Sequence, residues 1–173
     1  MNIDHISLDI KINPSISRVI AFGKITFSNI QTEISGILLN PDLTWHKLAI
    51  IINEKEFLVD ALEEKLADDS FLKVAKNWKI ILPNAVKNER NITLYFEYSG
   101  KILQTTFDIN YIRENVVELA DYAAWYPLIW GENFSFDLTL HSPENWVWMS
   151  NGNSLHCREC FKWRSSTKQN SIM

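Results

Sequence analysis

The sequence predicts an all-β protein: an antiparallel β-sandwich or a curved, saddle-like open sheet of about nine or ten strands with little helix. Two observations support this fold class. Apolar and polar residues alternate through most of the 173-residue chain, which is the period of a strand with one buried face. Hydrophobic residues make up 46% of the chain, and its seven Trp and nine Phe supply large side chains to fill the space between two sheets.

The first hundred residues contain most of the predicted strands. They cover residues 6–12, 18–29, 34–39, 48–52, 57–59, 78–82 and 92–98. Residues 53–56 (Asn-Glu-Lys-Glu) are expected at a hairpin tip, and Gly23 at a bulge or a close backbone approach. Residues 61–69 form the one mildly helical stretch. Strand 92–98 places Ile92, Leu94, Phe96 and Tyr98 on one face, and we expect this strand to be central.

The second part of the chain is less regular. Alternation stops over residues 101–126, and so long an aperiodic stretch in a compact domain is usually functional or packed under another element. Strands are predicted again at 134–140, 146–149 and 155–163, followed by a turn at 165–170. Residues 171–173 look like the opening of a further strand. We therefore expect residues 1–173 to be a single β domain, truncated at its C-terminal end.

The composition argues against several classes of function. The formal net charge is −4 with a pI of about 5.6, and no basic stripe indicates a nucleic-acid partner. No signal peptide and no run of about 18 apolar residues is present, so a cytoplasmic location is the default expectation. A longer parent protein can still be membrane-associated. Two cysteines do not make a disulfide framework, and we expect a reduced setting.

Metal and catalytic motifs are incomplete in this sequence. His156 precedes a C-x-x-C formed by Cys157 and Cys160, but a structural zinc site normally needs two such pairs. We therefore predict no metal site, and expect the cysteines to be small strand residues that point to opposite faces. The remaining histidines are isolated: His5, His46 and His141. H-E-x-x-H, G-x-S-x-G and glycine-rich phosphate loops are all missing, so no enzymatic activity is predicted for this chain alone.

Residues 97–152 carry a series of short motifs in a fixed order. They are Tyr98-Ser99-Gly100, Trp125-Tyr126-Pro127, Ser142-Pro143-Glu144 and Ser150-Asn151-Gly152. This order resembles the N-terminal β domain of the aminopeptidase N family of zinc metallopeptidases. One departure is Glu132-Asn133, which stands where that family commonly has an acidic residue followed by proline.

The resemblance implies a non-catalytic domain that packs on a zinc-containing catalytic domain and closes one side of its substrate cleft. Zinc is then a cofactor of the parent's catalytic domain, not of this chain. The implied partners are that missing catalytic domain in cis and, in the parent, a peptide substrate. A homodimer through the exposed interface is also possible.

The resemblance also implies one substrate-binding residue. Relatives carry Gln or Glu on a loop before the aromatic-proline turn, where it binds the free α-amine of the substrate. Glu118 lies nine residues before Pro127 and matches this position, with Asp121 as the second candidate. Two alternatives remain open: a stand-alone β-sandwich that binds carbohydrate or protein, and an enzyme of unknown type. Exposed tryptophans would favour the carbohydrate-binding module, although such rings are more often core or interface residues.

Overall fold

The computed structural model describes residues 1–30, 32–65, 75–86, 89–102, 111–120, 123–129, 131–143, 146–155, 157, 160–169 and 171–172. Within these residues the regular structure is β-strand, apart from the short 3-10 helices Pro14–Ile16 and Asn84–Val86. The strands are β1 (Asn2–Asn13), β2 (Arg18–Ser28), β3 (Glu33–Leu39), β4 (Leu43–Ile52), β5 (Lys55–Leu58), β6 (Ala61–Glu64), β7 (Lys76–Ile81), β8 (Ile92–Lys101), β9 (Tyr111–Arg113), β10 (Val116–Glu118), β11 (Leu128–Ile129), β12 (Phe134–His141), β13 (Asn153–Leu155) and β14 (Phe161–Gln169). The all-β prediction is confirmed.

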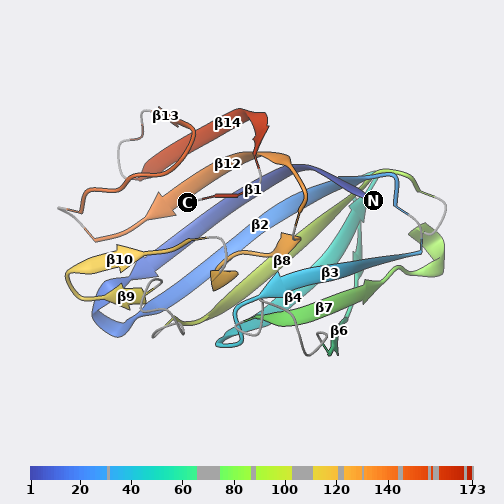
Figure 1. Ribbon diagram of the computed structural model, residues 1–173. Helices are drawn as coiled ribbons and strands as arrows, with labels where there is room; N and C mark the ends of the chain where they lie inside the picture. The colour runs from blue at the N-terminus through green and yellow to red at the C-terminus, as the bar shows by residue number, and fades with distance from the viewer. Residues whose placement is uncertain are drawn as a thin grey trace.

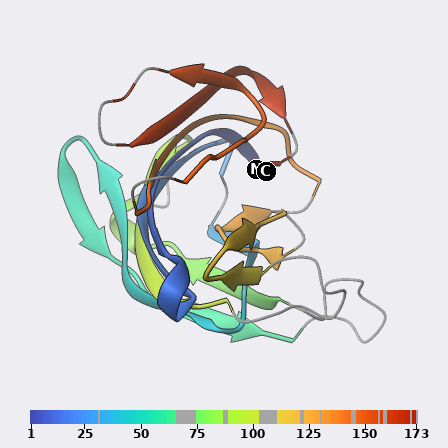
Figure 2. The ribbon, with the colours of Figure 1, turned by 90° about the vertical axis from the view of Figure 1, so that its left-hand side faces the viewer.

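The strands form one large and two small sheets (Figure 1). Eight strands pair in the order β13-β14-β12-β1-β2-β8-β4-β5, four in the order β11-β3-β7-β6, and β9 with β10. Figure 2 shows that the large sheet is strongly curved and that β9, β10 and β11 lie on its concave side. Among the described residues, no helix is long and apolar enough to cross a membrane.

Alternation along the strands produces one continuous core. The four residues predicted to share a face of β8, Ile92, Leu94, Phe96 and Tyr98, are all buried, and β8 is central because it pairs with β2 and β4. Residues of the four-stranded sheet belong to the same cluster, so the two sheets share this core. A strand with one apolar face is stable only when that face is covered. These placements confirm the prediction for β8.

Gly23 marks a close backbone approach rather than a bulge. It stays in register with Leu8 on one side and Phe96 on the other. A Cβ built at this position would meet the backbone oxygen of Ser7, and the Phe96 ring carbon Cζ at 2.7 Å. Only glycine leaves space for these neighbours.

One strand pair departs from the antiparallel arrangement. β1 and β12 are parallel, with Ile6 opposite Phe136 and Leu8 opposite Leu138. The chain leaves the large sheet after β8, passes through β9, β10 and β11, and returns as β12 beside β1. Parallel pairing requires such a long connection, and alternation within either strand carries no information about direction.

The short elements were the least predictable. Residues 61–64 form strand β6, not helix, because they pair with β7; residues 66–69 of that stretch lie outside the described residues. The turn expected at 165–170 is wrong for residues 165–169, which belong to β14; Gln169, the last residue of that strand, pairs with Phe134. Residue 170 lies outside the described residues. No strand forms at 146–149, and 171–172 have no regular structure. The hairpin tip before β5 is confirmed, with positive φ at Asn53 and Glu54.

Candidate interaction groove

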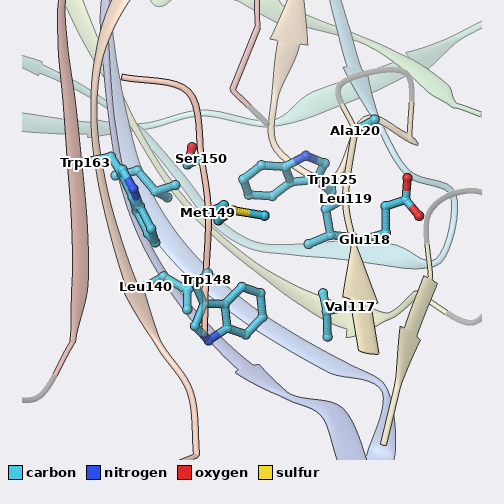
Figure 3. Close-up of a pocket in the computed structure, with 11 residues that line it drawn as sticks. Val117, Glu118, Leu119, Ala120, Trp125, Leu140, Trp148, Met149, Ser150 and Trp163 are labelled. Atoms are coloured by element: carbon cyan, nitrogen blue, oxygen red, sulfur yellow. The ribbon is translucent and has the colours of Figure 1, made fainter. Parts of the chain in front are cut away.

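A groove lies on the concave side of the large sheet, between β10 and the segment 146–150 (Figure 3). Its cavity volume is about 260 Å³. The lining is mainly apolar and consists of Val117, Glu118, Leu119, Ala120, Trp125, Leu138, Leu140, Trp148, Met149, Ser150 and Trp163. Leu138 and Leu140 of β12 and Trp163 of β14 form the floor, while the walls come from regions where alternation fails. This cavity is called the groove below.

The Trp125 wall of the groove is anchored to the core. The Tyr98 hydroxyl of β8 donates a hydrogen bond to the Trp125 carbonyl at 2.7 Å, and complete burial raises the pKa of Tyr98 well above its usual range. The Asn40 side chain donates to the Ala123 carbonyl at 3.0 Å, and its backbone N–H donates to the Ala124 carbonyl at 2.8 Å. Buried carbonyls are thus satisfied by residues of β8 and of the link after β3.

The opposite wall, residues 146–150, is far more exposed. Val147 is 88% and Met149 is 89% exposed. The wall is held at one end by Trp148, whose indole Nε1–H donates to Ser142 Oγ at 2.8 Å and whose ring stacks on Trp146 at 5.4 Å. Side chains of this size usually leave water when they can. Their exposure shows a face that the described part of the chain leaves uncovered.

Glu118 lies at the end of β10, opposite Tyr111, and is exposed. Figure 3 shows its carboxylate pointing away from the tryptophan and methionine side chains of the groove. Among the described residues this carboxylate has no ion-pair or hydrogen-bond partner. The second candidate, Asp121, lies outside the described residues.

The cysteines depart from the prediction. Cys157 and Cys160 are joined by a disulfide, and neither lies in a strand. Their Cα atoms are 5.4 Å apart, within the range that a disulfide can bridge. His156 lies outside the described residues. Among the residues that are described, no group of three or more His, Cys, Asp or Glu is placed to hold a metal.

The aromatic side chains near the groove differ in burial. Trp125, Tyr126 and Trp163 are buried, so packing is the correct interpretation for them, although Trp125 and Trp163 also line the groove. Trp146 and Trp148 are half-buried beside the groove. Trp130 lies outside the described residues. The sequence did not reveal the groove itself, because its walls come from segments without periodicity.

The outer face carries a polar network instead of a groove. Ser135 Oγ lies 2.8 Å from His5 Nδ1, His5 Nε2 lies 3.5 Å from Asp137, and Arg164 pairs with the same carboxylate. Ser135 also donates to the Asp4 carbonyl at 3.0 Å. These contacts connect β1, β12 and β14 across the parallel pair, and none of these residues lines the groove.

The fold has clear counterparts among solved structures, although no family model and no curated protein matches the sequence. The M1 zinc metallopeptidase from Deinococcus radiodurans superimposes with a TM-score of 0.68 at 10% identity, over 99% of this chain and 41% of its own. Yeast LTA4 hydrolase in complex with bestatin gives 0.67 at 11% identity, over 99% of this chain and 28% of its own. Native leukotriene A4 hydrolase from Saccharomyces cerevisiae superimposes with a TM-score of 0.63 at 11% identity, over 96% of this chain and 27% of its own.

These identities show the fold alone. The matched part is the N-terminal domain region of M1 peptidases, and the chain spans well under half the length of these structures. The fold implied by the resemblance is therefore confirmed. Activity, substrate and partner are not shown by the similarity.

Proposed function

We propose that this chain is the non-catalytic N-terminal β domain of an aminopeptidase N-like zinc metallopeptidase. The observation that supports this most directly is the superposition of nearly the whole chain on M1 zinc metallopeptidases, of which it covers 27–41%. In this proposal residues 1–173 are one β domain of a longer protein, and zinc belongs to the catalytic domain of that protein. The domain itself contributes packing and part of the substrate cleft.

The groove is the surface proposed to contact the catalytic domain. Met149 lines the groove and leaves 89% of its surface in water. Val116 and Val147, which are 43% and 88% exposed, do not line the groove but are chain neighbours of its lining residues Val117 and Trp148. Contiguous exposed apolar surface commonly marks an interface, and inter-domain contacts bury roughly 600–1,500 Å². A second copy of this chain could cover the same surface, and that alternative predicts a concentration-dependent dimer.

Glu118 is proposed to bind the α-ammonium group of a peptide substrate. Its carboxylate is exposed at the rim of the groove and has no partner among the described residues. When a catalytic domain covers the groove, this carboxylate becomes partly desolvated. A charge-assisted hydrogen bond to an ammonium group is then stronger than in open water.

The test uses the longer protein that contains this domain, whose downstream sequence is expected to contain H-E-x-x-H and a distal Glu. Glu118→Ala should raise KM for peptides with a free N-terminus by about tenfold, which corresponds to about 1.4 kcal/mol. The matched control is Glu114→Ala, an exposed Glu on the same hairpin that does not line the groove. It should leave KM unchanged.

Two results would contradict the proposal. One is a longer protein without a zinc-binding motif. The other is an equal KM effect of Glu118→Ala on N-acetylated peptides, which have no ammonium group to bind. Saturable binding of a glycan to the isolated chain, with no metallopeptidase downstream, would instead support the stand-alone binding module.

A further inference from the structure

The Cys157–Cys160 disulfide occupies a particular place in the fold. It lies in the link between β13 and β14, and it joins the only two cysteines of the 173-residue chain. Both cysteines are partly exposed, so a dithiol can reach the bond from solvent. The bond therefore lies between the two strands of the β13–β14 pair along the chain, at one edge of the large sheet.

Strand β13 is weakly held apart from this bond. It has three residues, all exposed, and it is one of the two edge strands of the large sheet. It pairs with β14 through Asn153–Arg164, Ser154–Trp163 and Leu155–Lys162. An edge strand with no buried side chain contributes little hydrophobic stabilisation and opens at low free energy. The disulfide limits how far such an opening can proceed, because it cross-links the chain between the two strands.

The strand continues directly into the exposed wall of the groove. Residues 146–150 precede β13, and Trp163, which pairs with Ser154, lies on the groove floor. Between wall and strand, the Asn151 side chain donates to the Ser171 carbonyl at 2.8 Å and also contacts Gln169. Besides the packing of Trp148 against the core, these polar contacts and the β13–β14 pairing hold the wall.

We propose that the Cys157–Cys160 disulfide is a redox-sensitive clasp that keeps β13 and the adjacent groove wall in place. A dithiol reductant opens it by thiol–disulfide exchange. One reductant thiolate attacks a protein sulfur, so that a mixed disulfide forms and the other cysteine is released as a thiolate. The second reductant thiolate then attacks the reductant's own sulfur in the mixed disulfide and releases the remaining cysteine. The reductant ends as a disulfide, and Cys157 and Cys160 each end as a thiol with one added electron and one added proton. In the reduced form β13 separates more often from β14, and the wall that carries Trp148 becomes mobile.

The proposal concerns the chain itself, and only its consequence for domain docking rests on the proposed function. Residue-resolved hydrogen exchange by NMR on the full chain tests it, in air-oxidised protein and after dithiothreitol. The probes are the backbone amides of β13 and the Trp148 indole N–H, which is bonded to Ser142. Both should exchange at least about tenfold faster in the reduced form, while amides of β1 and β8 keep their rates.

The control variant is C157S/C160S. It should exchange at the reduced rate with and without dithiothreitol. Three results would overturn the proposal: two free thiols in the air-oxidised chain, equal exchange in both redox forms, or an effect of dithiothreitol on C157S/C160S. A separately added catalytic domain that binds neither redox form would contradict the proposed function, whereas the exchange rates alone decide whether the clasp exists.

Discussion

Strand β8 and the groove wall 146–150 are both rich in large apolar side chains, yet they end in opposite environments. In β8, Phe96 and Tyr98 are completely buried. In the wall, Val147 and Met149 are almost completely exposed. β8 has a strand on each side and a second sheet over its apolar face, whereas the wall has no strand partner among the described residues. Neighbouring elements, rather than hydrophobicity alone, decide which of these side chains leave water.

The comparison also separates stability from interaction. Burial of an apolar side chain stabilises the fold by about 1.5–3 kcal/mol relative to exposure, so β8 contributes to folding and the wall contributes little. An apolar wall that does not stabilise its own domain is available for binding a partner. The two regions should therefore respond very differently to substitution.

The largest effect is expected in the core. Phe96→Ala should lower the free energy of unfolding by about 3–5 kcal/mol, because it removes a buried ring and leaves a cavity. Met149→Ala in the wall should change it by less than about 0.5 kcal/mol. Urea unfolding measures both. A loss of similar size in the two variants would mean that the wall is part of the folding core, contrary to the comparison.

The next effect tests how closely the central strands approach one another. Gly23→Ala should lower the free energy of unfolding by about 1–3 kcal/mol, because the added Cβ meets the backbone of Ser7 and the ring of Phe96. Gly36→Asn is the control: no atom lies within 4 Å of the Cβ position, and asparagine tolerates the φ of +76° there. The control should cost less than about 1 kcal/mol. If the two substitutions cost the same, the close approach at Gly23 is not the cause.

The difference between the two regions explains how much the sequence could predict. Alternation in β1, β2, β8 and β12 identified the strands and their buried faces. For Gly23 the sequence left a bulge and a close backbone approach open, and the structure shows the close approach. It could not identify the parallel direction of β12, because a period of two is the same in both directions. It also misassigned residues 61–64 as helical, since the pairing with β7 that makes them a strand is non-local.

The groove was only partly predictable, for a physical reason. The loss of alternation after residue 101 indicated the region in which residues 117–120 and Trp125 line the groove. A functional role for this region stays a prediction. Residues 146–149, in contrast, were predicted as a strand because they are apolar and β-prone. A strand needs a partner for its backbone groups, and no local pattern reveals whether one is present. The disulfide was missed because a lone C-x-x-C does not show whether its two cysteines come within bonding distance of each other.

A third prediction concerns the hydrogen bond that connects β8 to the other wall of the groove, at Trp125. Tyr98→Phe should lower the free energy of unfolding by about 1–2 kcal/mol, because the buried Trp125 carbonyl loses its hydrogen-bond donor. The same substitution should shift the NMR signals of the Trp125 wall. The control is Tyr95→Phe on the outer, half-buried side of β8, where the hydroxyl bonds to Glu97. The control should cost less and leave the groove signals unchanged. Unchanged groove signals in Tyr98→Phe would show that the wall does not depend on the core for its position.

The smallest effect on stability is expected at Glu118. Glu118→Ala should change the free energy of unfolding of this chain by less than about 0.5 kcal/mol, because the carboxylate is exposed and has no partner among the described residues. Glu114→Ala, on the same hairpin, should give an equally small change. Chemical denaturation of both variants measures it. A loss above about 2 kcal/mol in Glu118→Ala alone would make this residue part of the fold. Its proposed role in binding a substrate ammonium group would then have no support, since a residue that maintains the groove would change KM indirectly.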